Sequence, residues 1–172
     1  QTIANSSQQQ PTTGSCGVVL GKLQKYYQGG EARGILDHAA SVLPLKCTGC
    51  GRQVRGLLDV GKLTQADWFE LLYRSRFLLG LGDPMGPPSV LEAISLGCMA
   101  ILPRGRKQTL IMGRNHKSQY DDLERLVENQ PSINPYVCWY TTIQDLRSCV
   151  QGAATDPALP RIALREFTSD AF

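Results

Sequence analysis

The sequence lacks long hydrophobic runs and a strong charge of either sign. It contains no stretch of about eighteen consecutive apolar residues, the length that a membrane-spanning helix requires. Residues 1–15, QTIANSSQQQPTTGS, have neither the basic nor the apolar region of a signal peptide. Only 19% of residues are charged and the formal net charge is +3, too little for non-specific nucleic-acid binding. We therefore expect no membrane span and no export signal here, and any site for an anionic ligand must be local.

The sequence is also poor in metal ligands at metal-binding spacing. Neither of its two histidines has an identifiable partner. Cys47 and Cys50 form one close pair, CTGC, but a zinc ribbon needs a second such pair, and Cys138 and Cys149 are too far apart to be one. The CTGC pair could be half of a zinc ribbon or a redox-active pair. We favour a structural disulfide of undetermined connectivity and expect no metal site.

Cysteine content and one short motif bear on the compartment. Six cysteines are many for a cytosolic domain of 172 residues, and Asn5-Ser6-Ser7 matches the N-glycosylation pattern. Both features favour the secretory pathway.

The size and patterning predict one α/β domain. With 42% apolar residues, the chain can bury one sizeable core. Residues 1–15 are polar and predict a flexible lead-in, which leaves 16–172 as the folded domain.

Buried strands are predicted in CGVVLGK, RFLLGLG, CMAILP and PYVCWYTT, and one short strand with loops in PLKCTGCGRQVRGLLDVG. Helical spacing occurs in GGEARGILDHAASVL, LTQADWFELLYRS (with Thr64 as N-cap), SVLEAISLG, SQYDDLERLVENQ and TIQDLRSCVQGA. Alternation of strands and helices predicts a Rossmann-like, doubly wound parallel sheet covered on both faces.

The loop GLGDPMGPPS has the features of a ligand-binding segment. In open parallel sheets, ligands bind outside the carboxyl ends of the strands, where this loop is expected to lie. Gly80 and Gly82 allow close backbone approach, and Pro87 is one of three prolines that stiffen the loop. A helix that opens at Ser89 would direct its free N–H groups and positive dipole end outward, which favours a phosphate.

Glu92 follows this loop and has two interpretations. Ser89-x-x-Glu92 matches a capping box, in which the glutamate reaches back to the backbone of the N-cap residue. Alternatively, a carboxylate one turn into such a helix accepts hydrogen bonds from both hydroxyls of a ribose, while the N–H groups hold phosphates. Spacing alone leaves both open.

The segment LTQADWFELLYRSRFLLGLGDPMGPPSVLEAISLGCMAILP resembles the donor-binding half of the alpha-1,6-mannosylglycoprotein 6-beta-N-acetylglucosaminyltransferase family, that of N-acetylglucosaminyltransferase V. In that family an apolar strand ending in Gly-Leu-Gly leads through a Gly-Pro loop to Leu-Glu-Ala-Ile and Gly-Cys. GVVLGK, upstream of this segment, and GRN and PYVCW, downstream of it, occur in the same order as in the family. The similarity therefore covers roughly 17–150 and is strongest over 57–103.

The resemblance implies the C-terminal half of a GT-B enzyme, in which two Rossmann-like domains face each other across a cleft. Glu92 falls on the family's donor-binding glutamate, which grips the ribose of UDP. Arg114 falls where the family has a lysine at the UDP-GlcNAc diphosphate. The implied donor-binding residues are therefore Glu92, Arg114, Gly80, Gly82, Pro87 and Ser89.

The sequence also departs from the family. The family loop has an acidic residue followed by Gly-Pro where this chain has Gly86-Pro87-Pro88. The family's cysteine near the C-terminal EFT is absent, so we expect Cys98 to be free or to pair elsewhere. Among the aromatic residues, Tyr136 or Trp139 is a candidate to approach the uracil, against the simpler interpretation of packing.

No Asp-x-Asp metal motif occurs, and Asp121-Asp122 lies in a helical pattern typical of a solvated face. We therefore expect metal-independent stabilisation of the departing UDP by the helix dipole and Arg114, with Arg104, Arg106 and Lys107 as further candidates. No cofactor is expected besides the donor substrate UDP-GlcNAc.

These inferences predict the donor-binding domain of an inverting glycosyltransferase that moves GlcNAc from UDP-GlcNAc to the 6-hydroxyl of an N-glycan mannose. No catalytic residue is expected in this chain, because the family's catalytic carboxylate belongs to the missing acceptor-binding half. The chain alone is thus expected to bind donor without turnover. The Golgi lumen is the expected location, with a type II membrane anchor only outside this chain. The alternatives are a non-catalytic nucleotide- or glycan-binding module of the same fold and another UDP-sugar transferase.

Overall fold

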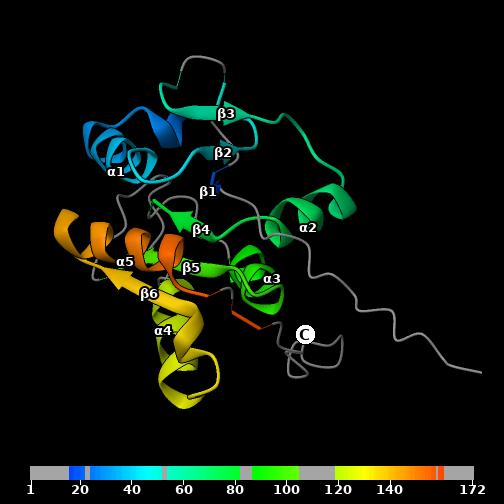
Figure 1. Cartoon of the computed structure of the whole chain (residues 1–172), viewed down its shortest axis with the longest axis vertical. Coiled ribbons are helices and arrows are strands. Elements are labelled where there is room, and N and C mark those ends of the chain that lie inside the picture. The colour runs from blue at the N-terminus through cyan, green and yellow to red at the C-terminus, as the bar shows by residue number, and fades with distance from the viewer. Residues whose placement is uncertain are drawn as a thin grey trace, which may run out of the picture.

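A six-stranded parallel sheet runs through the middle of the molecule (Figure 1). The computed structural model describes residues 16–21, 24–51, 54–81, 87–104, 119–157 and 159–160, so the predicted lead-in with its Asn5 sequon lies outside the described residues. The strands are β1 (Gly17–Leu20), β2 (Leu45–Cys47), β3 (Leu57–Asp59), β4 (Phe77–Gly80), β5 (Met99–Pro103) and β6 (Val137–Tyr140). Their order is β3-β2-β1-β4-β5-β6, and every neighbouring pair is parallel. The predicted doubly wound α/β fold is confirmed.

Helices cover both faces of this sheet. The helices α1 (Gly30–Ala40) and α5 (Ile143–Thr155) pack together on one face. The other face carries α2 (Gln65–Tyr73), α3 (Pro87–Ser95) and α4 (Gln119–Asn129), with α3 in contact with both of its neighbours (Figure 1). Two short 3₁₀ segments, η1 (Gln24–Tyr27) and η2 (Asn134–Tyr136), lie in connections.

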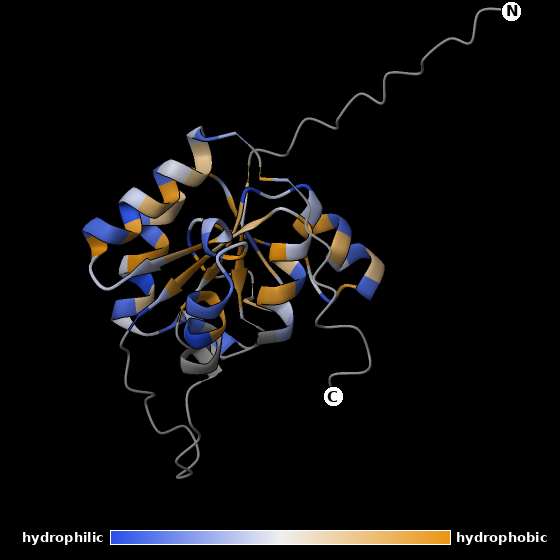
Figure 2. Cartoon of the chain, turned by 90° about the horizontal axis from the view of Figure 1, so that it is seen from below, coloured by the Kyte–Doolittle hydropathy of each residue, from blue (hydrophilic) through white to orange (hydrophobic). Residues whose placement is uncertain are grey.

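The two helical layers explain why the central strands are apolar at every position. Alternate residues of a strand point to opposite faces, so Val18 packs in the core under α2 and α3 while Val19 packs in the core under α1 and α5. Both side chains are at most 1% exposed. Figure 2 shows hydrophobic residues concentrated in the sheet and on the helix faces turned toward it.

Local signals set the helix ends. Thr64 is the N-cap of α2, as predicted, and its side chain accepts a hydrogen bond from the Asp67 backbone. Thr142 and Asp145 form a reciprocal capping box at α5. The helix α3 ends in a Schellman motif, in which Gly97 adopts φ +80° and the Cys98 amide donates to the Ala93 carbonyl at 2.9 Å.

Two local expectations were wrong. The segment from 44 to 61 contains two strands, β2 and β3, instead of one. Each has three residues, too few for a periodic pattern, and both are specified by their pairing in the sheet. The helix α3 begins at Pro87 rather than Ser89, because a proline in the first turn gives up an N–H that has no helical partner there.

The cysteines form two disulfides within the described residues. Cys47 pairs with Cys50 and Cys138 pairs with Cys149. The expectation of a disulfide at CTGC is therefore confirmed. Cys98 is a free, buried thiol, one of the two outcomes expected for it, and burial raises its pKa.

Among the described residues, no helix has both the length and the apolar content that crossing a bilayer requires.

Candidate functional site

The sheet has one switch point, between β1 and β4. Chain connections run outward from β1 through β2 to β3, and in the opposite direction from β4 through β5 to β6. Ligands of open α/β sheets bind at the carboxyl ends of the two strands that flank such a point. Leu20 and Gly80 are paired neighbours at these ends. Gly80 therefore lies at the position where the topology itself predicts a ligand crevice.

Two tyrosines fix the backbone at this edge. The Tyr140 hydroxyl donates to the Gly80 carbonyl at 2.8 Å, and the Tyr27 hydroxyl donates to the Gly21 carbonyl, also at 2.8 Å. Burial, followed by the charge of Asp59, raises the pKa of Tyr27, so its phenol stays protonated and remains a donor. A Cβ at Gly21 would lie 2.5 Å from the Tyr27 hydroxyl oxygen, so any larger residue there would have to displace the Tyr27 ring. These hydrogen bonds fix the backbone at both strand ends, where the topology predicts a ligand site.

The start of α3 offers fewer backbone donors than the sequence led us to expect. This helix follows β4, so its N-terminus lies at the same carboxyl edge as Gly80. Pro87 and Pro88 occupy its first two positions and have no N–H. The first backbone donor within α3 is therefore that of Ser89, a half-buried residue. An anion at this helix end would interact with the helix dipole and with the backbone N–H of Ser89. It would lack the N–H donors that residues other than proline provide in a first turn.

Glu92 does not cap α3. Because Ser89 is the third residue of the helix, it cannot be the N-cap, and the capping-box interpretation of Ser89 and Glu92 is wrong. Instead, Glu92 is half-buried against α2, where its Oε2 accepts a hydrogen bond of 2.8 Å from Nε1 of Trp68. Glu92 is the sixth residue of α3, about 7–8 Å along the axis from the first. The carboxylate is neither sealed in the core nor fully in solvent.

Trp68 is the partner that sequence reasoning missed. It is the fourth residue of α2, half-buried, and the helical pattern indicated only a packing role. Within the described residues it is the one hydrogen-bond donor to the Glu92 carboxylate, which leaves Oε1 available to another donor. No sequence signal joins residues 24 positions apart on two different helices.

The predicted cationic groups fall mostly outside what the structure describes. Arg114, Arg106 and Lys107 lie outside the described residues, as does Gly82. Arg104 directly follows β5, and its Nε donates to Oε1 of Glu124 on α4 at 2.6 Å. That exposed ion pair offsets the charge of Arg104, which therefore has a structural partner of its own.

The structure favours the packing interpretation of Tyr136 over a contact with the uracil. Tyr136 precedes β6, so it lies at the amino edge of the sheet, opposite the candidate crevice. It is 4% exposed, and its hydroxyl donates to the Pro160 carbonyl at 2.6 Å. Trp139 lies half-buried against the same core. Packing accounts for both residues. Asp121 and Asp122 belong to α4 as expected, and their side chains lie outside the described part.

Comparison with known proteins bears on the fold. No protein-family model matches the sequence, and no curated protein matches it. Among solved structures, the chain is similar to the glycotransferase of kitacinnamycin, with a TM-score of 0.51 and 14% identity over 92% of this chain and 39% of that one. It is also similar to MnaA of S. aureus, solved with UDP, with a TM-score of 0.48 and 12% identity over 84% of this chain and 37% of that one. This chain thus has a fold found in a glycosyltransferase, and it spans about two fifths of the length of those proteins.

Proposed function

We propose that this chain is the donor-binding half of a glycosyltransferase that uses UDP-GlcNAc. The observation that carries the proposal is the place of Glu92. A half-buried carboxylate, held by Trp68, stands on the helix that follows β4 at the switch point of the sheet. The fold shared with a glycosyltransferase over 92% of this chain supports the same class. The resemblance to the N-acetylglucosaminyltransferase V family supplies the nucleotide sugar and the roles of individual residues.

Each proposed contact has a chemical reason. Oε1 of Glu92, to which no described residue donates, accepts hydrogen bonds from the ribose hydroxyls, while Trp68 holds the other oxygen. Gly80 and Gly82 let the nucleotide come close to the backbone. Ser89, two residues after Pro87 in the first turn of α3, offers a hydroxyl and the first N–H of the helix to the diphosphate. Arg114 supplies the positive charge that the leaving UDP needs.

The reaction proposed for the complete enzyme is inverting transfer of GlcNAc to the 6-hydroxyl of an N-glycan mannose. It requires a base for the hydroxyl proton, which the acceptor-binding half would contribute. Metal-independent chemistry, the Golgi lumen and a type II anchor outside this chain belong to the same proposal, and all rest on the family resemblance.

Calorimetry with UDP and UDP-GlcNAc tests the site. Glu92→Gln keeps an acceptor for Trp68 but removes the charge that strengthens the ribose hydrogen bonds. We expect the affinity for UDP to fall by about 10-fold or more, because a hydrogen bond to a charged group contributes ~1.5–3 kcal/mol.

Arg114→Ala should weaken UDP binding as well. The matched control is Glu70→Gln, which removes an exposed carboxylate on α2 that pairs with Arg74, and it should bind UDP like the wild type. Equal affinity of Glu92→Gln and the wild type would reject Glu92 as the ribose ligand.

The second candidate is a non-catalytic nucleotide- or glycan-binding module of the same fold. Two observations favour it: one oxygen of Glu92 is already bound by Trp68, and Pro87 and Pro88 remove two backbone donors from the start of α3. A folded wild-type chain that binds neither UDP nor UDP-GlcNAc, yet binds a mannose-containing glycan, would support this module. Preference for another sugar in a panel of UDP-sugars would support a different transferase of the same architecture.

A further inference from the structure

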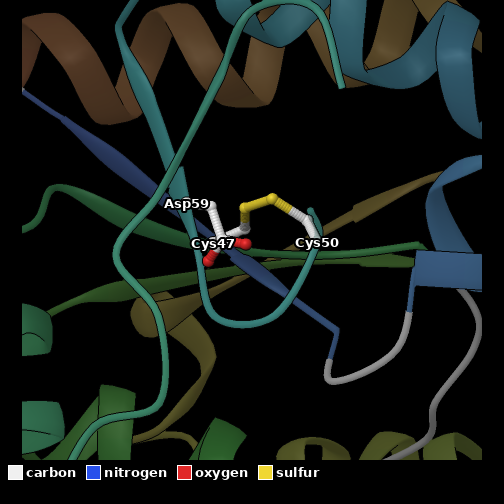
Figure 3. A group of neighbouring side chains, drawn as sticks. All are labelled: Cys47, Cys50 and Asp59. Carbon is white, nitrogen blue, oxygen red and sulfur yellow. A yellow bond between two sulfur atoms is a disulfide. The ribbon is translucent and has the colours of Figure 1, made fainter. Parts of the chain in front are cut away.

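The CTGC disulfide lies beside a carboxylate from the neighbouring strand. Cys47 ends β2, Cys50 lies in the turn that follows, and Asp59 ends β3, next to β2 in the sheet (Figure 3). One ligand atom from each of the three residues lies within 4.8 Å of the other two. Within the described residues, this is the one group of three metal-ligating side chains. Both cysteines are fully buried and Asp59 is half-buried.

Three backbone amides hold Asp59 in this position. Its Oδ1 accepts from the amides of Gly49 and Gly61, both at 2.9 Å, and its Oδ2 accepts from Gly51 at 2.8 Å. All three glycines have φ between 74° and 80°, a conformation that lets each amide turn toward the carboxylate. These hydrogen bonds, first that of Gly61, hold the pKa of Asp59 below its usual range, so the group is ionised at neutral pH.

The hydrogen bonds from the described residues leave one acceptor position of the Asp59 carboxylate open. A carboxylate offers about four acceptor positions, of which the two on Oδ1 and one on Oδ2 are used. One oxygen of this carboxylate lies within 4.8 Å of both sulfur atoms. Metal-binding carboxylates are commonly oriented by such outer hydrogen bonds.

We propose that the reduced form of this cluster is a binding site for a thiophilic divalent cation such as Zn²⁺. Its ligands are the sulfurs of Cys47 and Cys50 and one carboxylate oxygen of Asp59. Two thiolates and one carboxylate match the ligand preference of zinc and leave a fourth position for water. The disulfide and the metal site are alternative states of the same residues.

The exchange between the two states balances chemically. The S–S bond takes two electrons and two protons from a dithiol reductant, which becomes a disulfide, and Cys47 and Cys50 become thiols. Cation binding then replaces two S–H bonds by two metal–sulfur bonds and releases two protons. Metal binding is therefore expected only after reduction and should weaken as pH falls.

The test uses the full chain carrying Cys138→Ala and Cys149→Ala, so that the second disulfide supplies no thiols. After reduction with a phosphine, which does not itself chelate the metal as a dithiol would, Co²⁺ is titrated and its thiolate charge-transfer absorption is recorded. We expect one Co²⁺ per chain, displaced by Zn²⁺, and none in the oxidised protein. X-ray absorption of the zinc form should show two sulfur ligands at about 2.3 Å and lighter ligands at about 2.0 Å.

Two variants assign the ligands. Replacing Cys47 and Cys50 by serine in the same background should abolish the charge-transfer band, and Asp59→Asn should weaken Zn²⁺ binding by about 10-fold or more, with folding of both variants checked by circular dichroism. The proposal is overturned by a reduced protein that binds no Co²⁺, by a band that survives loss of both cysteines, or by a zinc site with four sulfur ligands. None of these results depends on UDP binding.

Discussion

At the residue scale, two carboxylates are held by backbone amides and make the fold sensitive to acid. Asp145 accepts hydrogen bonds from the amides of Thr142 and Thr141 and Asp59 from three glycine amides, and in both cases these bonds lower the pKa below its ordinary value. A group whose pKa is lower in the folded state contributes stability that is present above its unfolded pKa, about 4, and is lost as pH falls through the folded pKa.

We therefore expect the free energy of unfolding to fall as pH drops below about 4. A chain with both Asp59→Asn and Asp145→Asn should be less stable than the wild type at pH 7, and the difference should shrink as acid protonates the wild-type carboxylates. Urea unfolding measured from pH 7 to pH 3 checks this. A difference that stays constant over that range would contradict it.

At the same scale, Glu92 is a residue whose sequence motif allowed two different roles. Its sequence context fitted both a capping box and a ribose ligand, and spacing alone did not decide between them. The structure excludes the first by placing Ser89 inside α3, and it adds Trp68, which no spacing rule connects to Glu92. Whether Glu92 binds ribose stays a prediction, and the Glu92→Gln titration decides it.

At the element scale, the end of α3 depends on one glycine. Gly97 has φ +80°, and a Cβ added there would lie 2.5 Å from the Leu159 carbonyl oxygen. We expect Gly97→Ala to destabilise the fold by about 1–2 kcal/mol, because alanine is strained in this conformation and the backbone at Leu159 cannot yield as a side chain would. Urea unfolding gives the value.

The matched control is Gly34→Ala within α1. This glycine is inside a regular helix, and an added Cβ would meet nothing within 4 Å. It should stabilise the fold by about 0.5–1 kcal/mol, since alanine is the better helix former. Equal effects of the two substitutions would reject a special role for Gly97.

At the scale of the whole molecule, the proposed function makes this chain one half of a two-domain transferase. It spans 39% of the length of the glycotransferase whose fold it shares. We expect the isolated chain to bind UDP without transferring GlcNAc. Hydrogen exchange should show UDP protection at the carboxyl edge of β1 and β4 and in the first turns of α3, while a transfer assay with a mannose acceptor should detect no product. Robust transfer by the chain alone would contradict the half-enzyme proposal.

The sequence by itself determined the layers of the fold. Short apolar runs and helical spacing predicted β1, β4, β5 and β6 and the five helices, because their periodicity is a direct record of which side chains are buried. Turn chemistry predicted the N-cap at Thr64, since a cap depends on neighbours within a few residues. The close pair Cys47 and Cys50 predicted a structural disulfide without its connectivity, and the structure joins these two cysteines to each other.

Only the tertiary structure decided which strands pair and which residues of different elements are in contact. The strands β2 and β3 are too short for their own periodicity, so pairing specifies them. Sheet order brought Asp59 to the CTGC turn, and helix packing brought Trp68 to Glu92. Such contacts join residues distant in the chain, and their formation depends on the free energy of the whole packed core, which no local pattern encodes.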